Sequence, residues 1–106
     1  MTPNTVTAFT AAFLAGVLTA GPALSLTGAE VLDKMTEDER GGYLAGNVDM
    51  AAQLAYHDGK RERSDCIFDW YYKQGGLGQV LQAIGQFRDR QVQPVIHALI
   101  NRACGK

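Results

Sequence analysis

Apolar residues recur at helical spacing along most of the chain, and no segment alternates apolar and polar residues as a half-buried strand does. Residues 77–88 carry the clearest stripe, with apolar side chains three and four positions apart: Leu77, Val80, Leu81, Ile84 and Phe87. A last helix, expected to begin at Pro94 after a polar turn at residues 91–93, carries a second stripe: Val95, Ile96, Leu99, Ile100 and Ala103. The pattern predicts an all-α fold, a compact bundle of four to five short helices.

Helix starts are marked by two capping boxes, in which a threonine and the glutamate three positions later cap the same helix end. Thr27 and Glu30 predict a short helix toward Met35, and Thr36 and Glu39 predict a second helix that runs to about His57. Gly59 is the expected stop of this second helix.

A third helix is predicted over residues 66–73, capped by Ser64 or Asp65 and ended by the glycines at 75 and 76.

Gly42 and Gly46 lie four apart on one face of the second helix. Glycine inside a helix costs about 1 kcal/mol relative to alanine. Their spacing therefore predicts a close helix crossing inside the domain.

The first 29 residues hold no charged side chain, and an apolar block occupies residues 8–20. Small residues follow it, and the pairs Gly21/Ala23 and Ala23/Ser25 fit cleavage after residue 23 or after residue 25. This arrangement predicts a secretory signal peptide over residues 1–23 and a single domain over residues 26–106, periplasmic or secreted. The alternatives are an uncleaved anchor and an N-terminal core helix. A spanning helix needs about 20 apolar residues, and the apolar block at residues 8–20 is shorter. We expect no stable membrane insertion after cleavage.

The chain has two cysteines, Cys66 and Cys104, and export would place them in an oxidising compartment. We therefore expect one disulfide, which would close a loop of about 38 residues and contribute about 4 kcal/mol to a small domain. The alternative is two free thiols or a metal pair, although the spacing matches no zinc motif.

The third predicted helix is unusually aromatic, and its only charged pair within residues 66–73 is Asp69 and Lys73, spaced for an ion pair. The other positions from Cys66 to Tyr72 are apolar or aromatic. They cover more of the helix circumference than the apolar stripe of about 100° that a surface helix needs. One interpretation is a central helix wrapped by its neighbours. The other is a partner-binding surface formed by the helix's aromatic side chains: Phe68, Trp70, Tyr71 and Tyr72.

Catalytic and cofactor motifs are absent from the sequence. His57 and His97 could pair with Ser64 or Asp69 only through the fold, and the glycines at 75–78 lack the lysine of a phosphate loop. The basic run at residues 60–63 is interrupted by an acid and flanked by two more, unlike a nucleic-acid surface. We expect no enzyme, no cofactor, no metal and no nucleic-acid partner.

Three short segments stand in the order found in a known family: Gly42-Tyr43-Leu44-Ala45-Gly46, Cys66-Ile67, and Pro94 through Cys104. In this respect the chain resembles the Tai-like type VI secretion amidase-immunity family of small periplasmic helical proteins. Members usually carry a further cysteine just before the Gly-Tyr segment, paired with a cysteine upstream. In this chain Arg40 stands near that place. The resemblance implies binding of another protein and no catalysis.

The expected function is therefore that of an exported, non-catalytic module of immunity-like type that binds another protein, with homodimer formation as a further arrangement. The alternative is a periplasmic chaperone of acid or envelope stress, resembling HdeA, another small helical protein with one disulfide.

Overall fold

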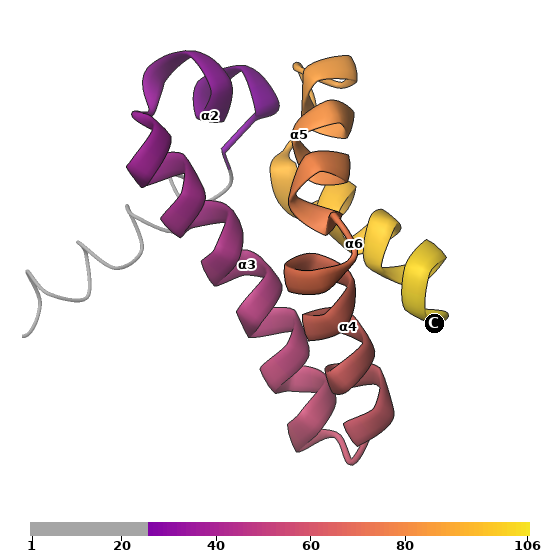
Figure 1. Ribbon diagram of the computed structural model, residues 1–106. Helices are drawn as coiled ribbons and strands as arrows, with labels where there is room; N and C mark the ends of the chain where they lie inside the picture. Colours follow the sequence, from indigo (N-terminus) through magenta and orange to yellow (C-terminus); the bar gives the residue numbers. More distant parts are fainter. Residues whose placement is uncertain (1–25) are drawn as a thin grey trace, which may run out of the picture.

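A computed structural model describes residues 26–106, which form five helices and no strand (Figure 1): α2 (Gly28–Lys34), α3 (Glu37–His57), α4 (Arg61–Lys73), α5 (Gly76–Gln86) and α6 (Val92–Cys104). The predicted all-α fold is confirmed. The leader predicted over residues 1–23 lies outside the described residues. Within the described part of the chain, no helix is long and apolar enough to cross a membrane.

Both predicted capping boxes are present. The Thr27 hydroxyl accepts the Glu30 backbone N–H at 3.2 Å, and the Glu30 carboxylate accepts the Thr27 N–H at 3.1 Å. Thr36 and Glu39 make the same exchange at 3.2 and 2.9 Å. Each box satisfies two backbone donors that a helix end leaves open.

Helices α3 and α4 lie side by side as an antiparallel hairpin (Figure 1), joined by a turn at which Gly59 has a φ of +79°. The predicted cap at Ser64 or Asp65 is wrong, because α4 already begins at Arg61 with Lys60 at its N-cap. The Ser64 N–H bonds to the Lys60 carbonyl at 3.1 Å, so Ser64 belongs to the first turn of the helix and its small side chain is buried.

The last helix also begins earlier than predicted, at Val92, so Pro94 occupies its third position and residues 92 and 93 are helical. Val92 is fully buried, and its N–H bonds to the Leu26 carbonyl at 2.8 Å. Proline is tolerated in the first turn because the N–H groups there have no partner within the helix. Ala103, expected to face the core, is exposed.

One core runs through all five helices. Its fully buried large side chains come from each of them: Val31, Leu44, Val48, Ile67, Val80, Ile84, Val92 and Ile100. The predicted stripe of α5 is confirmed at its centre, whereas its two ends, Leu77 and Phe87, are exposed. The predicted disulfide between Cys66 and Cys104 is also present, and it ties α4 to the end of α6.

The predicted close crossing at Gly42 and Gly46 is wrong. Both glycines are exposed, and a Cβ atom added at either would meet nothing within 4 Å. The close contacts occur at Gly28 and Gly76, where a Cβ would lie 2.5 Å from the Ile84 carbonyl oxygen and 2.7 Å from the Tyr71 Cα. The spacing of glycines on one face therefore did not identify which face is buried.

Candidate functional site

The four aromatic residues predicted as a partner-binding set divide between the core and the surface. Trp70 and Tyr71 are buried, with 3% and 5% of their surface exposed, and the Trp70 indole N–H donates to the Gln79 side chain at 3.1 Å. Tyr72 is 57% exposed, and Phe68 is half-buried. The central-helix interpretation therefore holds for Trp70 and Tyr71, while Phe68 and Tyr72 remain accessible to a partner.

Tyr72 is exposed but held in place. Its hydroxyl donates to the Asp49 carboxylate on α3 at 2.9 Å. Its ring stacks on Phe68, with centroids 6.3 Å apart and planes at 22°, and meets the Tyr71 ring edge-on at 4.9 Å. These contacts restrict the side chain before any partner arrives.

Tyr56 on α3 extends the exposed aromatic area and was missed by the sequence analysis. It is 50% exposed, and the Arg61 guanidinium lies 5.8 Å from its ring centroid. A shallow hollow of about 370 Å³ connects it with Phe68. Tyr56 stands seven residues after Asp49, so both side chains lie on one face of α3. This spacing is the sequence signal that could have identified Tyr56. We call Tyr56, Phe68 and Tyr72 the aromatic surface.

The two neighbouring tyrosines of α4 are stabilised in their neutral forms. Partial burial, followed by the hydrogen bond and the negative charge of Asp49, raises the pKa of Tyr72 above its usual value of 10.0. Burial and the same carboxylate raise the pKa of Tyr71. The Tyr72 hydroxyl therefore remains a proton donor to Asp49 at physiological pH.

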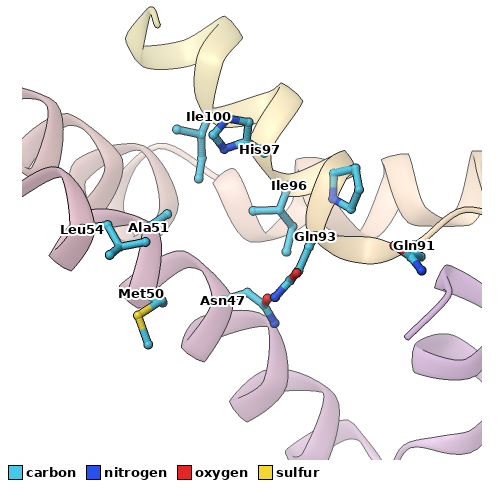
Figure 2. Close-up of a pocket in the computed structure, with 10 residues that line it drawn as sticks. Asn47, Met50, Ala51, Leu54, Gln91, Gln93, Ile96, His97 and Ile100 are labelled. Carbon is cyan, nitrogen blue, oxygen red and sulfur yellow. The ribbon is translucent and has the colours of Figure 1, made fainter. Parts of the chain in front are cut away.

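A second surface feature is a groove of about 520 Å³ between α3 and α6 (Figure 2). Met50 and Leu54 lie on its α3 side and are 60% and 59% exposed, and His97 lies on its α6 side. Figure 2 shows Asn47 and Gln93 pointing toward one another near one end. The residues that line the groove include no Asp, Glu, Lys or Arg: Asn47, Met50, Ala51, Leu54, Gln91, Gln93, Pro94, Ile96, His97 and Ile100.

Among the residues considered for catalysis, no hydrogen bond or ion pair joins His57 or His97 to Ser64 or Asp69 in the described part of the chain. Asp69 is paired with Lys73 at 3.4 Å, as predicted, and His57 lies edge-on to Tyr56 with ring centroids 5.8 Å apart. Ser64 borders the hollow beside Tyr56, whereas His97 lines the groove. Within residues 26–106, no group of three or more His, Cys, Asp or Glu side chains could hold a metal ion.

Comparison with known proteins gives no match: no family model, no curated protein and no solved structure is significantly similar to the chain.

Proposed function

We propose that the chain is an exported, non-catalytic module of immunity-like type that binds another protein through its aromatic surface. The observation that carries the proposal is Tyr72, which is 57% exposed although its hydroxyl is bonded to Asp49 and its ring is stacked on Phe68.

An exposed aromatic side chain that is already oriented is suited to anchor a partner. Tyrosine offers a large contact area and loses little conformational entropy on binding, particularly when neighbours restrict its rotamer beforehand. Tyrosine and arginine are also enriched among the residues that dominate interface energetics. Tyr56 with Arg61, and Tyr72 with Phe68, supply such groups on adjacent helices.

Photo-crosslinking in an exporting host tests this surface directly. A photoreactive amino acid is placed at position 72, and the captured protein is identified by mass spectrometry and then purified. Tyr72→Ala is expected to weaken the binary complex by about 30-fold or more, as removal of an anchor does.

Leu54→Glu is the matched control, because Leu54 is equally exposed but lies in the groove. This variant should retain the partner's affinity. Capture at position 54 instead of 72, or an unchanged affinity for Tyr72→Ala, would refute the proposal. The N-terminus of the purified protein checks export separately, with Leu24 or Leu26 expected as the first residue.

A second candidate, an acid-activated chaperone, is favoured by the two capping boxes. Hydrogen bonds from Thr27 and Thr36 lower the pKa of Glu30 and Glu39, so acid weakens both helix starts. A client-aggregation assay at about pH 2 to 3 distinguishes this function. Suppression of aggregation by the protein would favour it, and no suppression would exclude it.

A further inference from the structure

We propose that a hollow between α5 and α6 binds a small amphipathic anion, an alkyl chain that ends in a carboxylate. The inference goes beyond the proposed function, because neither α3 nor α4 lines the hollow and none of its residues belongs to the aromatic surface. Its volume is about 360 Å³. Small-molecule sites have volumes of about 300–1,000 Å³, so the hollow is large enough for such a ligand.

The floor of the hollow is apolar. Ala98 and Leu99 follow Val95 by three and four residues, so the three side chains share one side of α6. Phe87, at the end of α5, completes the floor and is 46% exposed. An alkyl chain that lies against this surface is removed from water, which stabilises the complex.

Two arginines, Arg90 and Arg102, border the apolar floor, and no acidic residue lines the hollow. Arg102 follows Leu99 by three residues and Val95 by seven, so it continues the same face of α6. The Arg90 guanidinium lies 5.8 Å from the Phe87 ring centroid. Each arginine therefore places a cation beside apolar surface that an alkyl chain can contact.

These two arginines have no acidic partner. Neither forms an ion pair or a side-chain hydrogen bond within residues 26–106, whereas Arg88 is paired with Asp33 on α2. Residues 74–106 contain four Lys and Arg and one acid, Asp89, which does not line the hollow. This excess of positive charge attracts an anion to the hollow.

The size of the hollow and its arginines together select the occupant. A standard protein interface uses about 20–30 residues on each side, whereas eight residues line this hollow. A membrane is contacted through protruding apolar side chains, whereas Val95 and Leu99 are half-buried. Arginine pairs with a carboxylate through two parallel N–H bonds, so a carboxylate is the head group that Arg90 or Arg102 fits.

Titration of the ¹⁵N-labelled, oxidised protein with decanoate, followed by NMR, tests the inference. Saturable shifts are expected at the amides of residues 87, 95, 98, 99 and 102, with a dissociation constant of about 1 mM or lower. Decyltrimethylammonium has the same chain with the opposite charge, and acetate has the charge without the chain. Neither compound should cause these shifts.

Ala98→Glu places a carboxylate in the hollow and should abolish decanoate binding. Ala98 is exposed, so circular dichroism should show unchanged folding. Gln93→Glu is the matched control, because Gln93 is also exposed on α6 but lies about 140° around the helix from Ala98 and lines the groove with α3. This variant should bind decanoate like the wild type. Arg90→Gln with Arg102→Gln should weaken binding about tenfold.

Shifts centred on the groove between α3 and α6, equal shifts with decyltrimethylammonium, or an unchanged affinity of Ala98→Glu would each overturn the inference. So would the absence of saturable shifts at millimolar decanoate. Co-sedimentation with phosphatidylglycerol vesicles is the membrane arm, and vesicle binding without a response to decanoate would also contradict the proposal. Its failure is separate from that of the proposed function, because Tyr72→Ala should leave decanoate binding unchanged.

Discussion

Gly76 lies so close to Trp70 that a Cβ atom added at residue 76 would be 2.8 Å from the Trp70 carbonyl oxygen and 2.9 Å from its ring atom Cε2. The contact occurs where α4 turns into α5, and the indole is fixed there by its hydrogen bond to Gln79. Only a residue without a side chain leaves this arrangement undisturbed.

Gly76→Ala is therefore expected to lower the free energy of unfolding by about 1 to 3 kcal/mol, because backbone and a buried ring must shift to admit the methyl group. Gly46→Ala is the matched control, since its Cβ would meet nothing and alanine favours the helix by about 1 kcal/mol. Urea unfolding followed by Trp70 fluorescence measures both. Equal effects of the two substitutions would contradict the close contact at Gly76.

Loss of the disulfide between Cys66 and Cys104 should be the most damaging single change to stability. The bridge spans 38 positions, and a loop of that length corresponds to about 4 kcal/mol. That is a large part of the 5–15 kcal/mol that stabilises a typical domain. The double variant Cys66→Ser/Cys104→Ser should match the reduced wild-type protein in urea unfolding. A reduced protein as stable as the oxidised one would refute this expectation.

The capping boxes predict how stability depends on pH. Because Thr27 and Thr36 lower the folded-state pKa of Glu30 and Glu39 below 4.5, their contribution is fully present above pH 4.5. It is lost as the pH falls through the lower folded-state values. The variant Glu30→Gln/Glu39→Gln keeps the cap geometry without the charge, so its unfolding midpoint should fall less on acidification. Parallel midpoints for the two proteins between pH 7 and pH 3 would rule out this role.

The Asp49 carboxylate should control the titration of Tyr72. Asp49→Asn removes the negative charge but keeps an acceptor, so the pKa of Tyr72 should fall toward 10.0. The Cζ chemical shift of labelled tyrosine, assigned with Tyr72→Phe, reports this value. Asp58→Asn, at the far end of α3, should leave it unchanged. A Tyr72 titration that is insensitive to Asp49 would show that the hydrogen bond is not formed in solution.

Local features of the fold could be predicted from the sequence, whereas features that depend on distant contacts could not. The boxes at Thr27 and Thr36 involve residues three positions apart, so the sequence was sufficient. Val92 begins α6 because Leu26, far away in the chain, accepts its N–H. Gly42 and Gly46 share a face, but only the packing of the whole domain decides that this face is exposed.

The candidate site follows the same division. The composition of α4 identified an aromatic group, yet the rotation of the helix against α3 decides that Trp70 is buried and Tyr72 exposed. Tyr56 belongs to another helix and joins the surface only through the α3–α4 hairpin. Met50 and Leu54 are exposed because they lie on another side of α3 from its buried residues, which are Leu44, Val48, Ala52 and Ala55.

The position of the disulfide along the chain has a mechanical consequence. The bridge makes a covalent ring of residues 66–104, which holds most of α4 and all of α5 and α6. Helices α2 and α3 precede the ring, and apart from the chain itself only non-covalent contacts hold them to it. Under a pulling force applied at residue 26 and at the C-terminal end, the 40 residues from 26 to 66 can extend by about 3.5 Å each, to roughly 140 Å. The ring itself stays closed, so α3 yields while the other end of the domain keeps its shape.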